Sequence, residues 1–204
     1  MELHHPGSIR TLREFLTHLV IVTLGILIAL GLEAVVDAHH RKKLAAEAVD
    51  GFRHELTDNR AQVAEVLARM PRLREQIDAQ IGALGAPAPP TTAGQPIKYP
   101  GITFDLMTTA SWDTAIATQA LNDIPYARVR GYSEAYGVLR LFVEEERIGF
   151  GTWQDLRIFG DDASRLSPEQ RRALIEQLRR YENFTHVIDT IGRGALQSID
   201  GALR

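Results

Sequence analysis

The sequence predicts an all-α protein in which one N-terminal transmembrane helix continues into a helical bundle of about four helices. Three observations lead to this prediction. Residues 15–36 form a long apolar stretch, residues 49–84 repeat apolar positions at helical spacing, and no segment has the alternating pattern of a strand. The predicted parts are an N-terminal tail, a transmembrane helix, a juxtamembrane amphipathic helix, a Pro/Gly-rich connection and a helical bundle, at residues 1–14, 15–36, 37–84, 85–104 and 105–204.

Composition and motifs exclude several classes of function. The 204 residues carry a net charge of −3, without the basic excess typical of nucleic-acid-binding proteins. Cysteine is absent, which excludes disulfides, thiolate metal sites and cysteine nucleophiles. The sequence has no phosphate-binding loop, nucleophile elbow or paired catalytic carboxylates. We therefore expect no catalytic residues, no cofactor, no metal and no nucleic-acid partner.

The stretch from Phe15 to Val36 is long enough to cross a bilayer. At 1.5 Å per residue it reaches about 33 Å, against a hydrocarbon core of roughly 30 Å. Its apolar side chains cover all faces, whereas a soluble surface helix would show a stripe. The alternatives are a buried core helix and a signal peptide cleaved after Val36-Asp37-Ala38. The length of the stretch and the interruption by Glu33 favour a span over a signal peptide.

Polar residues mark the predicted exit from the membrane. Glu33 is expected at headgroup level rather than in a proton-relay or ion-binding site. Arg41, Lys42 and Lys43 follow it and are expected to contact lipid headgroups, so the lipid bilayer is the first predicted partner. A metal site in the same region is disfavoured, because its histidines are not three or four residues apart as helical ligands need to be: His39, His40 and His54.

A seam of apolar residues at spacings of three and four follows the basic exit. Only Asn59 and Gln80 are polar among its eleven positions, which are Val49, Phe52, Leu56, Asn59, Val63, Val66, Met70, Leu73, Ile77, Gln80 and Leu84. The seam is typical of a coiled coil between subunits, and equally of a helix packed on its own domain. Pro71 favours the second interpretation, because it should kink or break the helix near Met70.

Two patterns together predict a homo-oligomer. Gly25 and Ala29 form a small-xxx-small pair that lets two spans approach closely in lipid. Outside the membrane, a shared coiled coil would place Leu56, Asn59 and Val63 in the oligomer interface, with Asn59 restricting the register.

The second half of the chain contains further helices separated by breaks. Residues 85–104 hold five prolines and three glycines, which predicts an irregular, partly extended connection. The next helix is expected to run through Leu121, with a hydroxyl cap from Thr108, Thr109 or Ser111. Another is expected to start near Pro125 and run towards Phe159.

Breaks and caps shape the remaining helices. Gly149 and Gly151 are expected to interrupt the helix that starts near Pro125. Ser167 and Pro168 predict a helix start, since a hydroxyl cap precedes a proline in the first turn. One apolar face of that last helix comprises Leu174, Leu178, Tyr181, Ile188, Ala195 and Ile199.

Aromatic residues of the second half suggest a possible ligand pocket. Trp112, Tyr132 and Tyr136 have the spacing to line such a pocket, although aromatic residues at helical spacing more often form the core, which is the favoured interpretation.

Four segments resemble a group of uncharacterised bacterial inner-membrane proteins. They are His4-His5-Pro6, the apolar core Gly25-Ile26-Leu27-Ile28-Ala29-Leu30, Glu55-Leu56 with Asn59, and Ser111-Trp112 with Ala117 and Ala120-Leu121. The resemblance covers about the first 60 residues well and the rest loosely. It implies a bacterial membrane protein and brings no catalytic residues with it.

Orientation and function follow as expectations. Arg10 and Arg13 precede the span and residues 41–43 follow it, a count that favours a cytoplasmic C-terminal side. A single N-terminal span before a long domain usually leaves that domain outside, so we expect a single-pass inner-membrane protein with a periplasmic C-terminal domain. The expected function is structural, in a self-associating protein or an accessory subunit of a membrane complex. The alternative is an extracytoplasmic sensory or ligand-binding helical module.

Overall fold

The computed structural model of the chain describes residues 12–86, 94–101 and 107–204. Within these ranges the chain is helical and has no strand; Pro96 and Asp162 form an isolated bridge. The α-helices are α1 (Leu12–Gly85), α2 (Ala110–Ala117), α3 (Tyr126–Leu156) and α4 (Pro168–Leu203), and the 3₁₀ turns are η1 (Ala120–Asp123), η2 (Arg157–Phe159) and η3 (Ala163–Arg165). The all-α prediction is confirmed.

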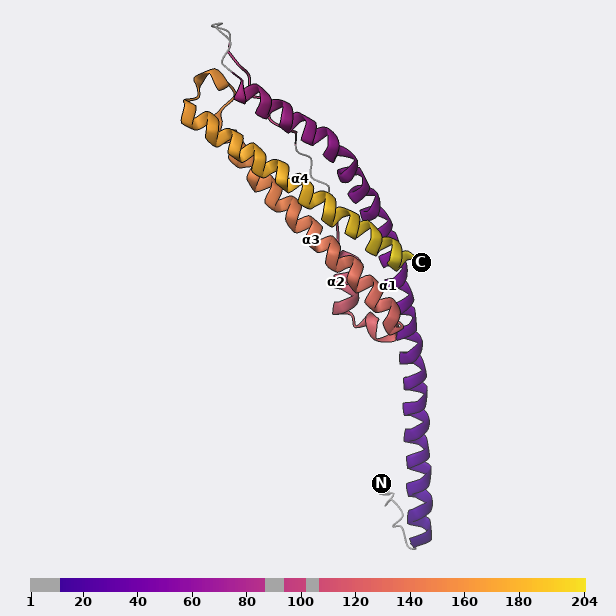
Figure 1. Ribbon diagram of the computed structural model, residues 1–204. Helices are drawn as coiled ribbons and strands as arrows, with labels where there is room; N and C mark the ends of the chain where they lie inside the picture. Colours follow the sequence, from indigo (N-terminus) through magenta and orange to yellow (C-terminus); the bar gives the residue numbers. More distant parts are fainter. Residues whose placement is uncertain (1–11, 87–93, 102–106) are drawn as a thin grey trace, which may run out of the picture.

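The first half of α1 projects from the rest of the molecule as an unsupported helix (Figure 1). Every large apolar side chain from Phe15 to Val36 is between 48% and 68% exposed. Among the described residues, α1 is the one helix that is long and apolar enough to cross a membrane. The alternative of a buried core helix is wrong, because none of this stretch is buried by the described part of the chain.

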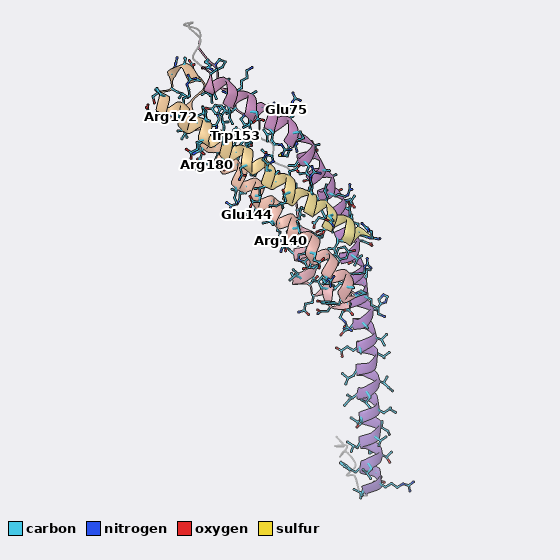
Figure 2. The ribbon with its side chains drawn as sticks, in the orientation of Figure 1. Glu75, Arg140, Glu144, Trp153, Arg172 and Arg180 are labelled. Carbon is cyan, nitrogen blue, oxygen red and sulfur yellow. The ribbon has the colours of Figure 1, made fainter. Side chains whose placement is uncertain are left out.

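The second half of α1 forms a bundle with α3 and α4. The chain runs up α1 and α3 and returns down α4, which packs against both long helices (Figure 1). Two contacts show that α1 and α4 are antiparallel. Arg60 Nε, in the middle of α1, lies 2.6 Å from Asp200 Oδ1 near the end of α4, and Arg171 Nη1, at the start of α4, donates to the Leu84 carbonyl near the end of α1 at 3.3 Å. Charged side chains such as Arg140, Glu144, Arg172 and Arg180 lie on the outer side of α3 and α4 (Figure 2).

The predicted seam of α1 faces the interior of its own domain. Nine of its eleven positions are buried, and the other two, Val49 and Leu73, are half-buried. The seam contacts both core clusters, one around Phe52 and Tyr136 and one around Ile77 and Leu178. The expected subunit contact through Leu56, Asn59 and Val63 is therefore replaced by intramolecular packing, since those three residues are 0%, 1% and 0% exposed.

Pro71 does not end α1, contrary to the expectation of a break near Met70. The helix continues for fourteen residues beyond it, to Gly85. Pro71 itself is exposed, so its ring lies on the side of the helix next to water, and the Leu67 carbonyl loses its amide partner. Buried residues before and after it, Val66 and Ile77, hold both halves against α4, and α1 curves gently over the bundle (Figure 1).

The helix expected through Leu121 stops four residues early. Gln119 has a left-handed backbone, with φ of 59°, and this reversal separates α2 from η1. The turn directs Ala120 and Ile124 into the core, where they are 4% and 7% exposed. Core packing outweighs continuation of the helix at this point.

Glycines permit close crossings rather than interrupting helices. Gly149 and Gly151 lie inside the continuous helix α3, which corrects the expected interruption. A Cβ at Gly149 would overlap the ring of Phe184, so this glycine admits a ring from α4. Gly192 of α4 serves the same purpose towards Leu67.

The start of α4 follows its sequence signal. Ser167 Oγ accepts the Gln170 amide at 3.2 Å, and Gln170 Oε1 accepts the Ser167 amide at 2.8 Å. This reciprocal capping box, with Pro168 in the first turn, confirms the predicted helix start.

We predict that Gly192→Leu destabilises the domain. Even a Cβ there would lie 2.7 Å from Leu67 Cδ2 and 2.8 Å from Phe142 Cε2. Overpacking of this kind costs about 1–3 kcal/mol. Thermal unfolding of the full chain in detergent, followed by circular dichroism, should show a lower midpoint.

The matched control is Gly137→Leu, on an exposed position of α3 where a Cβ would have no atom within 4 Å among the described residues. Replacing this glycine should stabilise the helix by up to about 1 kcal/mol, because glycine has a low helix propensity. Equal midpoints for the two variants would contradict the close crossing at Gly192.

Candidate functional site

A polar clamp on α1 holds the start of α2. Glu55 is only 7% exposed, and both its carboxylate oxygens are hydrogen-bonded. Its Oε1 accepts the Tyr136 hydroxyl at 2.7 Å, and its Oε2 accepts the Ser111 backbone amide at 3.0 Å. Ser111 lies in the first turn of α2, where unpaired amides and the helix dipole favour a carboxylate. Glu55 therefore joins α1, α2 and α3 at one point.

Asn59, one turn further along α1, completes the clamp. Its Oδ1 accepts the Thr108 amide at 3.1 Å, and its Nδ2 donates to the Thr108 carbonyl at 2.7 Å. Gln80, the other polar residue of the seam, accepts the Lys98 amide at 3.0 Å. Both polar positions of the seam thus bind the backbone of the segments that follow α1. This pairing explains why a buried helix face carries two amides.

The aromatic residues predicted as a possible ligand pocket are packed core. Phe52 lies between them, with ring centroids 5.5 Å from Trp112 and 4.9 Å from Tyr132. Trp112 stacks on Tyr136 at 5.3 Å, and all four rings are at most 6% exposed. The rings fill the space between α1, α2 and α3, so the favoured core interpretation describes them.

The clamp is suited to holding structure rather than to proton transfer. Burial, followed by the hydrogen bond to Glu55, raises the pKa of Tyr136 far above its ordinary value. Its hydroxyl therefore remains a hydrogen-bond donor over the physiological pH range. The arrangement fixes the positions of the helices.

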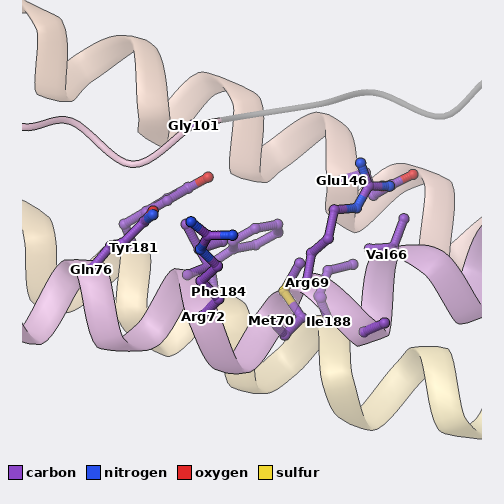
Figure 3. A pocket seen from close by; sticks show the side chains of 12 residues that line it. Val66, Arg69, Met70, Arg72, Gln76, Gly101, Glu146, Tyr181, Phe184 and Ile188 are labelled. Carbon is purple, nitrogen blue, oxygen red and sulfur yellow. The ribbon is translucent and has the colours of Figure 1, made fainter.

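A cavity of about 500 Å³ opens further along α1, away from the clamp (Figure 3). Its floor is apolar and comes from α1 and α4: Val66, Met70, Leu73, Tyr181, Phe184 and Ile188. Polar side chains lie around it, with Arg69, Arg72 and Gln76 on α1 and Glu146 on α3. Sequence reasoning missed this cavity, because its floor residues have the pattern of ordinary core positions.

The shape and chemistry of this cavity suit a small, mostly apolar ligand. Its volume lies in the range of small-molecule pockets, which are typically about 300–1,000 Å³. Burial raises the pKa of Tyr181, on its floor, to about 12, so this phenol stays neutral. Among the described lining residues, the charged side chains are Arg69 and Arg72 on α1 and Glu146 on α3.

The predicted membrane-exit residues lie along one exposed stretch of α1. Arg41 Nε lies 3.5 Å from Asp123 Oδ2, and Lys43 Nζ lies 3.7 Å from Glu47 Oε1. Lys42 is exposed, as is Glu33, which sits three residues before the end of the apolar stretch. The basic exit therefore also contacts the folded domain, through Arg41 and η1.

The remaining predicted positions are separate from both the clamp and the cavity. Gly25 and Ala29 are exposed on the apolar part of α1, and nothing lies within 4 Å of a Cβ at Gly25. His54 pairs with Asp58 at 3.6 Å on the protein surface. No group of three potential metal ligands occurs in the described ranges.

No family model, curated protein or solved structure matches the chain. Its function must therefore be inferred from its own residues. In the clamp, Glu55 and Asn59 of α1 hold Ser111 and Thr108 of the second half of the chain. Spacing alone did not indicate that these segments touch, since 49 residues separate Asn59 from Thr108.

We predict that Tyr136→Phe destabilises the domain by about 1–3 kcal/mol, because it leaves a buried carboxylate oxygen of Glu55 without its donor. Tyr126→Phe is the matched control. It makes the same chemical change on a side chain that is 81% exposed, where about 0.5 kcal/mol or less is expected. Chemical denaturation of the full chain measures both. Equal effects would contradict the clamp.

Proposed function

We propose that the protein is a single-span membrane protein whose helical domain is a rigid structural and interaction module. One observation carries this proposal. The exposed apolar stretch and the buried seam belong to the same uninterrupted helix, α1, so that no linker separates a membrane anchor from the domain. From Val36 to Gly85 the helix path is about 73 Å long. Such a helix holds a partner-binding surface at a set height above a bilayer.

The absence of a linker distinguishes this arrangement from a simple tether. A flexible connection lets a domain search for partners, whereas a continuous helix transmits the position and rotation of the span directly. A structural component or an accessory subunit of a larger inner-membrane complex requires a fixed position and rotation relative to its membrane span. The clamp supports the same function, because it fixes α2 and α3 to α1 close to the membrane end of the domain.

Self-association in this proposal uses the span. The seam outside the membrane is occupied by α3 and α4, so Leu56, Asn59 and Val63 are not available to a second copy. Gly25 and Ala29 remain exposed and provide a close-packing surface in lipid. The homo-oligomer is thus proposed to form between spans, with the helical domains side by side.

For its location we propose the bacterial inner membrane, with the domain in the periplasm. This rests on the resemblance of the N-terminal segments and on the usual behaviour of a single span that precedes a long domain. An alkaline phosphatase fusion after Arg204 should be active in that orientation. An inactive fusion, with a fluorescent cytoplasmic reporter at the same position, would assign the domain to the cytoplasm.

The cavity favours a second candidate function, an extracytoplasmic ligand-binding module. Its apolar floor and polar edge match a small molecule with a mostly apolar body. Native mass spectrometry of the protein from its own membranes tests this candidate. A bound mass that is lost in Leu73→Trp, which fills the cavity, would support it, and a ligand-free spectrum would exclude it.

We predict that Leu27→Arg prevents membrane insertion or leads to degradation, because a charge at the centre of a span costs several kcal/mol. Ile158→Arg is the matched control. Both leucine and isoleucine are exposed, at 60% and 78%, so neither change disturbs the fold. After carbonate extraction, the wild type and Ile158→Arg should stay in the membrane fraction. A soluble wild type, or equal behaviour of the two variants, would contradict the anchor.

We predict that replacing Gly25 and Ala29 together with Ile weakens self-association, since the larger side chains keep two spans apart. Gly31→Ile is the control, because residue 31 points about 200° away from Ala29 at 100° per residue. Native mass spectrometry in mild detergent should show fewer oligomers for the double variant only. An exclusively monomeric wild type would contradict association through the span.

A further inference from the structure

One end of the domain lies close to the level at which α1 leaves its apolar stretch. The ion pair between Arg41 and Asp123 places η1 beside residue 41, five residues beyond Val36. Five residues of helix correspond to about 7.5 Å. In Figure 1 the turn between α2 and α3 is accordingly the lowest part of the bundle, nearest to the projecting half of α1.

This distance is comparable to the thickness of a headgroup layer. A bilayer has a hydrocarbon core of about 30 Å and a total thickness of about 40–45 Å, which leaves about 5–7.5 Å of headgroups on each side. With Val36 at the edge of the core, η1 lies at the outer edge of the headgroups. With Glu33 at headgroup level and Leu32 at the edge of the core, residue 41 lies about 13.5 Å beyond the core, and exposed side chains of the turn have to extend towards the lipid.

The exposed side chains of this turn have the chemistry of a membrane interface. Tyr126, the first residue of α3, is 81% exposed, whereas Tyr132, Tyr136 and Tyr181 are at most 1% exposed. Side chains of a helix lean towards its N-terminus, which in α3 is the end that faces the membrane. Tyrosine is enriched at membrane interfaces because it combines an apolar ring with a polar tip.

Two more exposed side chains belong to the helices on either side of η1. Ile116, near the end of α2, is 52% exposed, and Arg128, the third residue of α3, is also exposed, with its Nη2 donating to the Tyr132 hydroxyl at 3.2 Å. We name the surface formed by Ile116, η1, Tyr126 and Arg128 the membrane-facing corner.

We propose that the membrane-facing corner rests on the lipid headgroup layer as a second membrane contact beside the span. This inference rests on the proposed function, since it requires α1 to cross the bilayer. A span alone leaves a domain free to tilt and rotate, and two contacts fix both. The corner would thus orient the domain relative to the membrane plane, as a rigid interaction module requires.

Spin labels in lipid nanodiscs that hold a single copy of the full chain test this proposal. The chain has no cysteine, so one introduced cysteine gives one label. Leu27→Cys reports the span, Ala127→Cys reports the corner with Tyr126 and Arg128 intact, and Ile158→Cys reports η2, just beyond the far end of α3. Power saturation in the presence of oxygen or a water-soluble nickel complex measures the depth of each label.

The expected result is a gradient along the molecule. The label at 27 should favour oxygen strongly, and the label at 127 should be several-fold less accessible to nickel than the label at 158. Adding Tyr126→Asp to Ala127→Cys should raise the nickel accessibility towards that of 158, because a carboxylate is repelled by anionic headgroups and lacks the ring.

Each contrary outcome has a separate meaning. A label at 27 that nickel reaches freely would reject the membrane anchor itself. A label at 27 in hydrocarbon, with 127 as accessible to nickel as 158, would reject the membrane-facing corner alone. Protection of 127 only in discs that hold two copies would also overturn the proposal, and would assign the corner to contact between copies.

Discussion

The structure depends on the continuity of α1 as one helix from Leu12 to Gly85, in which Pro71 removes a single backbone hydrogen bond. In hydrocarbon every amide and carbonyl needs a partner within the segment, which a helix provides on its own. In water the same helix is stable only if an apolar face is covered. The two halves of α1 meet these two requirements in turn, first with apolar side chains on all sides and then with one buried seam. The other helices are organised around that seam.

The seam carries polar residues where the chain must return to it. Asn59 and Gln80 are separated by three heptads. Asn59 binds the backbone of Thr108, and Gln80 binds the backbone of Lys98. Glu55 adds the first turn of α2 and the hydroxyl of Tyr136. A buried amide or carboxylate without a hydrogen-bond partner is costly. These residues therefore favour one alignment of the later segments along α1 over alignments shifted by a residue or more. They give specificity to a helix face that apolar contacts alone would leave free to slide.

Periodicity and local signals predicted much of this architecture. The apolar stretch, the seam positions and the cap at Ser167 depend on local sequence, and the structure has each of them where it was expected. Long-range contacts had no such signal. Glu55 stands beside the seam and looks like a surface residue, although its spacing of four from Asn59 placed both on nearly the same face. The passage of α1 through Pro71 and the ring of Phe184 at Gly149 depend on helix packing, which single-helix propensities do not contain.

Rigid coupling of the apolar stretch to the domain is the central claim, and a distance across their junction tests it most directly. Val35→Cys and Ala61→Cys are both exposed on α1 and can be spin-labelled in the otherwise cysteine-free chain. Their 26-residue separation corresponds to about 39 Å in a continuous helix. Pulsed electron paramagnetic resonance in lipid bilayers should give a single narrow distribution near this distance. A broad distribution, or one centred at much shorter distances, would show a hinge between span and domain and would contradict the account.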